Sequence, residues 1–205
     1  MSINPYDPRW QRLAVLFCRS TRVRPRSNVL LHAIGPEALP FITALQDEVL
    51  RRGGFPDVQM TFPELERRFL RQATDDQLRA FPHWDLARMK AMDVYIAGRA
   101  RANAFNLNGV PSERVMARTA VVRPIFDRRI KKTRWCITYV PTNGDALLAG
   151  MSTEDYTDFF FDACLQDYAA MGRAQEPLRA LMERTDTVHI TAQLLNAVRT
   201  YFERN

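Results

Sequence analysis

The chain has 205 residues, of which 46% are hydrophobic and 25% are charged. These are ordinary values for a folded domain with a sizeable buried core, so they exclude a wholly disordered polypeptide. The formal net charge of +6 comes almost entirely from arginine, because lysine occurs only at Lys90, Lys131 and Lys132.

Hydrophobic periodicity predicts strands and helices that alternate along the chain. Short apolar runs indicate strands at residues 28–34, 58–62, 93–97, 135–140 and 187–192. Helical spacing indicates helices at residues 7–20, 37–52, 63–71, 82–89, 112–132 and 174–185, one after Ser152, and a helical turn near 74–81. This order favours parallel pairing through right-handed crossovers. We therefore predict the α/β class, with a mainly parallel open sheet of about five strands and helices on both faces.

Several helix boundaries carry residues with known roles at helix ends. Asp7 is expected to cap the first helix, with Pro8 in its first turn. Gly53 is expected to end the second helix, since glycine accepts the left-handed conformation found there. Pro124 is expected to interrupt the long helix at residues 112–132, because proline lacks the N–H donor that a helix interior needs.

The stretch from residue 134 to 168 is the most informative part of the sequence. Ser152 stands at an N-cap position, and Asp155 follows in the first turn, where the helix dipole favours carboxylates. The expected inner face of this helix consists of Tyr156, Phe159, Phe160, Ala163, Cys164 and Tyr168. Because three consecutive phenylalanines begin at residue 159, one ring must lie off this face, against either a partner or a second helix.

The sequence gives little support for a metal site. The only histidines are His32, His83 and His189. None has a partner at ligand spacing, and we expect those in predicted strands to be hydrogen-bonded core or rim residues. Three aspartates that share one helical face are Asp155, Asp158 and Asp162. They suit either a hard cation or a solvated acidic stripe, and we favour the stripe.

Nucleophilic catalysis is also unsupported, because there is no Gly-x-Ser-x-Gly elbow. The three cysteines, Cys18, Cys136 and Cys164, are odd in number and widely spaced, which favours reduced thiols over a disulfide framework. The first residues lack the apolar core of a signal peptide, and no apolar run is long enough to span a bilayer. We therefore expect a soluble cytoplasmic protein without membrane contact.

The arginines are scattered over helices rather than clustered with aromatic side chains. A solvated or ion-paired basic surface is therefore favoured over a nucleic-acid face, which needs clustered phosphate contacts. The segment at residues 98–109 contains Asn103, Asn106 and Asn108 and follows a predicted strand. In open α/β sheets such loops commonly bind ligands.

The stretch after residue 134 also resembles a known family. The matching residues, in order, are Arg134-Trp135-Cys136, Pro141-Thr142, Ala149-Gly150-Met151-Ser152, Glu154, Tyr156 and Phe159. They resemble the signature near the end of the N-terminal domain of metal-dependent leucyl aminopeptidases of the thermophilic aminopeptidase T and aminopeptidase S type. Further matches are Val23, Pro25, Asn28-Val29-Leu30, Arg51-Arg52-Gly53-Gly54, Gly109-Val110-Pro111 and Val188-His189-Ile190-Thr191. Arg26-Ser27 departs from the Gly-Asp that the family has before its first strand.

The resemblance implies peptide hydrolysis by a pair of divalent metals, cobalt or zinc, with a bridging water as nucleophile and a glutamate as general base. In the family these ligands follow the point that corresponds to Thr191, where the present sequence departs from the pattern. We therefore expect residues 1–191 to form the aminopeptidase N-terminal-like domain without its metal-binding domain. We assign no catalytic, cofactor-binding or metal-binding residue, expect no cofactor in this chain, and expect the chain to be inactive alone.

Residues 192–205 are expected to form a divergent amphipathic helical tail, because apolar residues recur there at helical spacing. Three functions remain open. The first is an aminopeptidase-family protein, inactive alone or completed by a homo-oligomer or a separate catalytic-domain polypeptide. The second is a non-catalytic interaction module that uses the apolar tail or the basic surface. The third, an arginine-mediated nucleic-acid binder, has the least support.

Overall fold

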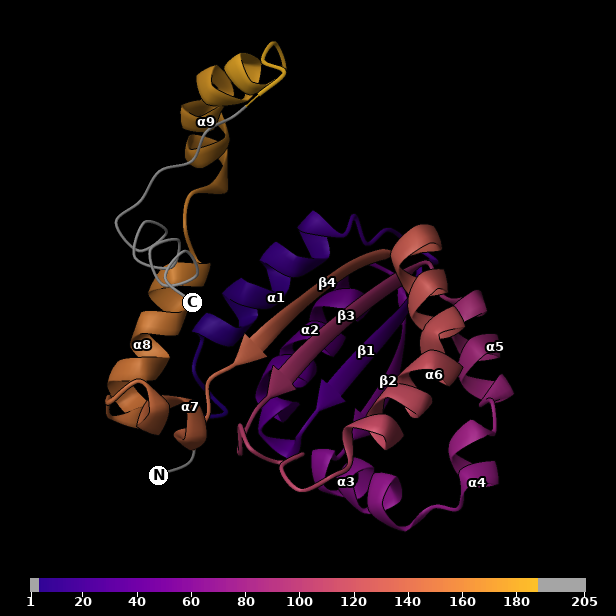
Figure 1. Ribbon diagram of the computed structural model, residues 1–205. Helices are drawn as coiled ribbons and strands as arrows, with labels where there is room; N and C mark the ends of the chain where they lie inside the picture. Colours follow the sequence, from indigo (N-terminus) through magenta and orange to yellow (C-terminus); the bar gives the residue numbers. More distant parts are fainter. Residues whose placement is uncertain (1–3, 188–205) are drawn as a thin grey trace. The chain divides into compact units, whose positions relative to one another are not determined.

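The computed structural model describes residues 4–187, and its centre is a four-stranded parallel sheet (Figure 1). The strands are β1 (Asn28–Ile34), β2 (Phe55–Thr61), β3 (Val94–Ala100) and β4 (Arg134–Val140), in the spatial order β2-β1-β3-β4. Each neighbouring pair is parallel, so the predicted α/β class is confirmed. Two predictions lie outside the described residues. They are the domain boundary at residue 191 and, apart from residue 187, the strand at residues 187–192.

The helices alternate with these strands. They are α1 (Arg9–Ser20), the 3₁₀ turn η1 (Pro36–Ala38), α2 (Leu39–Arg51), α3 (Pro63–Gln72), α4 (Asp75–Arg79), α5 (His83–Ala91), α6 (Ser112–Lys132), α7 (Asn143–Leu148), α8 (Thr153–Cys164) and α9 (Tyr168–Met182). Within residues 4–187, no helix combines the length and apolar character that crossing a bilayer requires. The chain divides into two compact units after Leu165, so the sheet and α1–α8 belong to the first unit and α9 to the second.

Side chains alternate along each strand, so each strand contributes to both faces of the sheet. On the first face, Leu31 of β1 and Ile96 of β3 are fully buried in one cluster with Leu13 of α1 and Phe41 of α2. Helices α1 and α2 cover this side of the sheet, and α3–α6 cover the other (Figure 1). Most of the buried apolar area of the unit therefore lies between the first face and α1 and α2.

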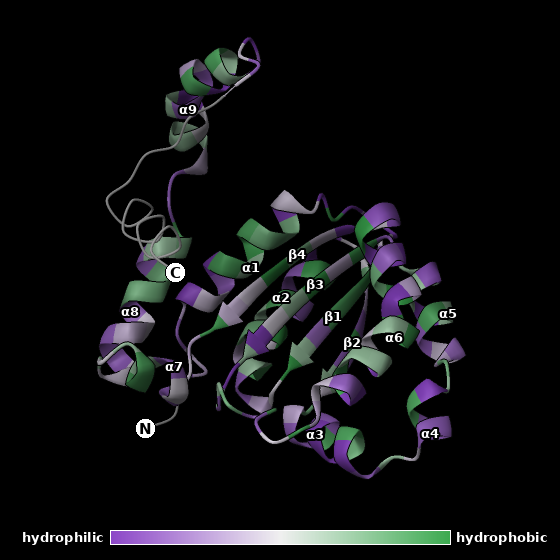
Figure 2. Ribbon diagram, viewed as in Figure 1, coloured by the Kyte–Doolittle hydropathy of each residue, from purple (hydrophilic) through white to green (hydrophobic). Residues whose placement is uncertain are grey.

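The second face is less completely packed. Its buried cluster is small and consists of Leu30, Met89, Tyr95 and Ala97. Helix α6 contributes no buried residue, although it spans 21 residues. Hydrophobic and hydrophilic residues alternate along α5 and α6, whereas β1 is mainly hydrophobic (Figure 2). The helices on this side cover the sheet without filling the space above it.

Helix α8 joins the first core through an aromatic contact with α1. Ser152 caps it as predicted, and its hydroxyl accepts the Asp155 N–H at 3.0 Å. The predicted inner face is partly wrong, because Phe161 is 1% exposed whereas Phe159 is 59% exposed. The Phe161 ring meets Trp10 edge-on, with ring centroids 4.6 Å apart. The direction from which α1 packs on α8 selects Phe161, and local periodicity does not contain that information.

Other boundary predictions are confirmed or corrected by small amounts. Helix α1 begins at Arg9 rather than residue 7, and the Asp7 carboxylate accepts the Arg9 N–H at 2.9 Å. Gly53 ends α2 with φ +74°, as predicted. The predicted interruption at Pro124 is wrong, because α6 continues through it. Pro124 lies on the exposed side of α6, where the carbonyl group that loses its N–H partner can bond to water.

The described part of the second unit is centred on α9. The Asp167 carboxylate caps this helix by accepting the N–H groups of Ala169 and Ala170 at 3.0 and 2.9 Å. Arg179 pairs with Glu176 and Glu183 on the same helix. These pairs lie at helical spacing on an exposed surface, so water screens them and they contribute little to stability. The helix starts six residues earlier than the predicted segment at residues 174–185.

Candidate functional site

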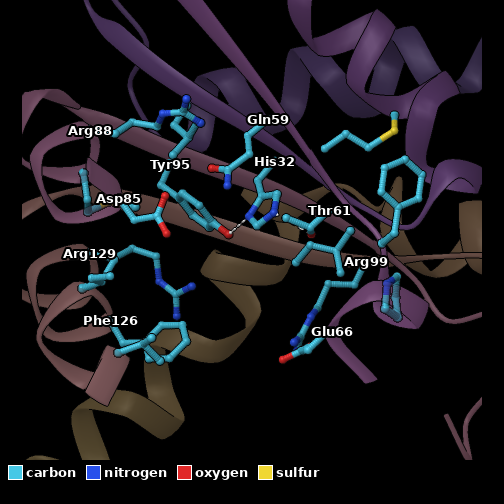
Figure 3. A pocket seen from close by; sticks show the side chains of 18 of the residues that line it. His32, Gln59, Thr61, Glu66, Asp85, Arg88, Tyr95, Arg99, Phe126 and Arg129 are labelled. Atoms are coloured by element: carbon cyan, nitrogen blue, oxygen red, sulfur yellow. Dashed lines mark hydrogen bonds between the residues drawn. The ribbon is translucent and has the colours of Figure 1, made fainter. Parts of the chain in front are cut away.

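A cavity of about 690 Å³ lies between the second face of the sheet and helices α3, α5 and α6 (Figure 3). We call it the sheet pocket. Its floor consists of residues from all four strands that line the cavity, including Leu30, Thr61, Tyr95 and Ile137. The cavity forms here because the three helices contribute few buried side chains to this face, so the space above the strands is not filled.

A row of three hydrogen-bonded polar side chains crosses the floor of the sheet pocket. His32 Nδ1 lies 2.8 Å from the Tyr95 hydroxyl, and His32 Nε2 lies 2.9 Å from Thr61 Oγ1. Figure 3 shows His32 between these two partners. The row joins β2, β1 and β3, so it spans the junction between β1 and β3, where the strand order reverses. In open α/β sheets ligands usually bind at this junction, in the crevice beyond the carboxyl ends of the strands.

His32 is neutral at pH 7. Burial, and to a smaller extent the positive charges of Arg129, Arg99 and Arg88, together lower the pKa of His32 to about 4. Burial also raises the pKa of the Tyr95 hydroxyl, which therefore stays protonated. The polar row is uncharged, and the charge in the sheet pocket resides on the surrounding arginines and carboxylates.

Arg129 of α6 lies close to three aromatic rings. Its guanidinium carbon lies 5.0 Å from the ring centroid of Tyr95, 5.2 Å from that of Phe126 and 5.7 Å from that of Trp135. Contacts of this kind fix the plane of a guanidinium group through cation–π attraction. The Arg129 Nε atom is buried and has no hydrogen-bond partner among the described residues.

The other arginines that line the sheet pocket differ in how they are held. Arg118 donates to the Ala80 carbonyl oxygen at 2.7 Å, so its position depends on the end of α4. Arg88 lies 3.5 Å from a carboxylate oxygen of Asp57. The Arg99 side chain is exposed, and it makes no hydrogen bond or ion pair within residues 4–187. Arg99 is therefore available to a ligand without loss of a hydrogen bond or ion pair to these residues.

The polar row has the order of a hydroxyl, an imidazole and an orienting group, which is also the order in nucleophilic triads. Thr61 would be the nucleophile, His32 the base and Tyr95 the orienting group. An effective general base has a pKa near the working pH, and the pKa of His32 is about 4. The row is therefore suited to binding rather than to proton abstraction.

The described residues do not fit a two-metal centre. Residues 4–187 contain no group of three or more His, Cys, Asp or Glu side chains placed to hold a metal ion. Glu37 has a buried carboxylate oxygen, Oε2, without a hydrogen-bond partner, but a single carboxylate is too few for a divalent ion. No step of metal-assisted hydrolysis can be assigned to these side chains.

The residues considered as metal ligands from the sequence lie apart from one another. His32 is a hydrogen-bonded sheet residue, as expected, whereas His83 contacts the ring of Phe81 at 4.9 Å. His189 lies outside the described residues. Asp155 accepts the Ser152 hydroxyl, and Asp158 lies 2.6 Å from an Arg9 nitrogen. These contacts favour the structural interpretation of the acidic stripe over a cation site.

The loop predicted at residues 98–109 is wrong in its extent, because residues 98–100 belong to β3. The part that follows makes hydrogen bonds to α3. Asn106 Nδ2 donates to the Pro63 carbonyl at 2.8 Å, and the Asn108 carbonyl accepts from Arg67 at 2.9 Å. The loop therefore anchors the start of α3, and the sheet pocket lies on the face of the sheet beside it.

Most residues of the sheet pocket could not be predicted from the sequence, because they come from seven separate elements, the four strands and helices α3, α5 and α6. The signals that were present are polar residues inside apolar strands: His32 within β1 and Arg99 near the end of β3. The contribution of Arg129 had no such signal. It lies in a basic helix, and only the packing of α6 against the sheet brings it above Tyr95.

Comparison with known proteins gives a family and a fold. A family model described as thermophilic metalloprotease (M29) matches residues 7–201. The solved structure of wild-type AmpT from Thermus thermophilus is similar with a TM-score of 0.70 at 21% identity, covering 87% of this chain and 49% of that one. The chain thus spans about half the length of this structural neighbour, and at this identity the likeness is one of fold. No curated protein sequence matches the chain.

Proposed function

The chain belongs to the thermophilic metalloprotease (M29) family, and from this membership we propose that its α/β unit is the non-catalytic N-terminal domain of a metal-dependent aminopeptidase. The type proposed is that of leucyl aminopeptidases T and S. The signature that begins at Arg134 and the fold likeness to AmpT support this assignment. On this proposal the unit contributes structure and contacts to an enzyme whose metal-dependent chemistry depends on residues outside the described part.

The observation that carries the proposal is the donor set of residues 4–187. Two-metal hydrolysis requires several carboxylates and imidazoles that converge on two ions and a bridging water. The described side chains supply no such group, and the buried Glu37 oxygen stands alone. Metal dependence belongs to the family, and on this proposal its ligands lie outside residues 4–187.

An activity assay tests the proposal directly. The 205-residue chain is incubated with leucine p-nitroanilide and cobalt or zinc, with Thermus thermophilus AmpT as the positive control. We expect no release of p-nitroaniline above a blank that contains the metal alone. Metal-dependent turnover by the chain would contradict the proposal. The variant Glu37→Gln would then show whether the buried carboxylate takes part.

A metal-binding measurement gives a second, independent test. Calorimetric titration with cobalt or zinc is expected to give no stoichiometric, tight binding, because one carboxylate cannot hold a divalent ion against water. Uptake of two equivalents by the purified chain would refute the proposal even if the substrate were wrongly chosen. The pair of tests therefore separates a wrong substrate from a wrong assignment of the domain.

A non-catalytic interaction module is the second candidate, and exposed apolar residues favour it. Leu147 and Leu148 of α7 are 80% and 56% exposed, and Phe159 of α8 is 59% exposed. Exposed apolar groups on adjacent helices are typical of protein interaction surfaces. Light scattering after size exclusion tests self-association: a dimer that Leu147→Ser converts to monomer would support this candidate.

A further inference from the structure

The two faces of the sheet are packed to different degrees, and the difference creates a space of useful size. Helices α3 and α5 each bury one residue, Leu70 and Met89, and α6 buries none. The resulting volume of about 690 Å³ falls within the roughly 300–1,000 Å³ of small-molecule sites. The sheet pocket is therefore large enough for an organic ligand.

The charges that line the sheet pocket favour an anion. Its four cationic side chains are Arg88, Arg99, Arg118 and Arg129, and its two carboxylates are Glu66 and Asp85. The polar row between them is neutral. An excess of positive charge in a partly enclosed site attracts anions more strongly than the same charge on an open surface, because low-dielectric walls focus the field.

Two of these arginines have donors that the protein does not use. The buried Arg129 Nε has no partner, and leaving a buried donor unsatisfied is unfavourable. The Arg99 side chain makes no hydrogen bond or ion pair within the described residues. A carboxylate matches the fork of a guanidinium group and forms short, charge-assisted hydrogen bonds with it. Such a group would give an acceptor to these two guanidinium groups where they line the pocket.

The rest of the lining is apolar and aromatic. Leu65 and Phe69 of α3 and Phe126 of α6 line the pocket with 59%, 38% and 38% of their surface exposed. Exposed rings beside a cavity gain apolar burial when a ligand covers them. The ligand is thus expected to have an apolar body as well as a charged group.

We propose that the sheet pocket binds a small organic carboxylate, with its carboxylate at Arg129 and Arg99 and its aliphatic or aromatic body against α3 and α6. The ligand bridges the polar row and the exposed rings. The proposal concerns only the second face of the sheet, so it does not depend on the peptidase assignment.

The test uses three probes of one series on the purified 205-residue chain. They are 4-phenylbutyrate, which has both parts of the proposed ligand, the neutral 4-phenylbutan-1-ol, and acetate. Titration followed by ¹H–¹⁵N NMR is expected to show that 4-phenylbutyrate binds at least about tenfold more tightly than either of the others, since a charge-assisted hydrogen bond has this magnitude. Equal affinity of the acid and the alcohol, or no binding of the acid, would overturn the proposal.

Variants locate the site. Arg99→Gln and Arg129→Gln are each expected to weaken 4-phenylbutyrate binding about tenfold. The matched control is Arg128→Gln, one residue away on α6, whose guanidinium donates to the Lys90 carbonyl and does not line the pocket. The control should stay within about twofold of the parent chain. Unchanged binding by both pocket variants, with native circular dichroism, would refute the site. Arg99→Gln removes no hydrogen bond or ion pair within residues 4–187, so it keeps the test valid if Arg129→Gln fails to fold.

Discussion

The replacement Phe161→Ala tests how α8 is held against the first core. Phe161 is 1% exposed, and its ring contacts Trp10 and Phe160 at centroid distances of 4.6 and 5.3 Å. Burying such a side chain contributes about 1.5–3 kcal/mol, and the cavity left by alanine raises the usual cost of Phe→Ala to about 3–5 kcal/mol. That range already includes the energy of the aromatic contacts with Trp10 and Phe160. We therefore expect the free energy of unfolding to fall by about 4 kcal/mol.

Phe159→Ala is the matched control for this replacement, because it removes the same ring two residues away. Phe159 is 59% exposed, so its loss should change stability by no more than about 0.5 kcal/mol. Urea unfolding followed by circular dichroism and by tryptophan fluorescence measures both variants. At about 2–4 °C for each kcal/mol, Phe161→Ala should lower Tm by roughly 8–16 °C. An equal or larger loss with Phe159→Ala would show that α8 packs through the other face.

Three further predictions concern ionisable groups in the first unit. Glu48 is fully buried, and its hydrogen bond to Arg51 holds the pKa of Glu48 below its usual range. Glu48→Gln should therefore lower the free energy of unfolding by about 1–3 kcal/mol at pH 7, as measured by urea unfolding. The variant should also lose less stability than the parent chain as pH falls through that lowered pKa. His32 has a folded-state pKa of about 4, which is below its unfolded value, so protonation of His32 favours the unfolded chain. The free energy of unfolding should therefore fall by up to about 3 kcal/mol as pH drops from 6.5 to 4. A midpoint above pH 6 in an NMR titration of His32 would contradict this prediction. Burial raises the pKa of the Cys18 thiol to about 12, so it should react with a disulfide reagent at pH 8 only after unfolding, and rapid labelling of Cys18 in the native chain would be inconsistent with the structure.

The strands were largely predictable, because their apolar runs are local. The predicted bounds of β1 are the same as the observed ones, and β4 differs by one residue. Strand β2 starts three residues earlier than predicted because Phe55 and Pro56 lie at the edge of the sheet, where proline is tolerated. Strand β3 extends through Gly98 because its neighbours continue to pair with it there. The differences therefore come from tertiary pairing.

The sheet pocket was less predictable than the strands. Its central contact joins His32 to Tyr95, which lies 63 positions away, and local periodicity carries no information on such a pair. The arginines of α6 are among those expected from the sequence to form a solvated or ion-paired basic surface. Arg129 differs from Arg128 only in its angular position on the helix, which places it above Tyr95 and Trp135. The orientation of one helix thus decides which arginines belong to the site.

The two faces of the sheet differ in how well they are packed, and this difference indicates which face serves a function besides stability. The first face is filled by apolar side chains, which favour a single stable fold. On the second face, His32 lies between Leu31 and Ala33 in a buried strand, and Arg129 has a buried nitrogen without a partner. Aliphatic side chains at these positions would fill the space and remove the cost of burying polar groups. Departures from packing rules that bring no stability are expected at functional positions, so the second face is where a binding function of this unit should be sought.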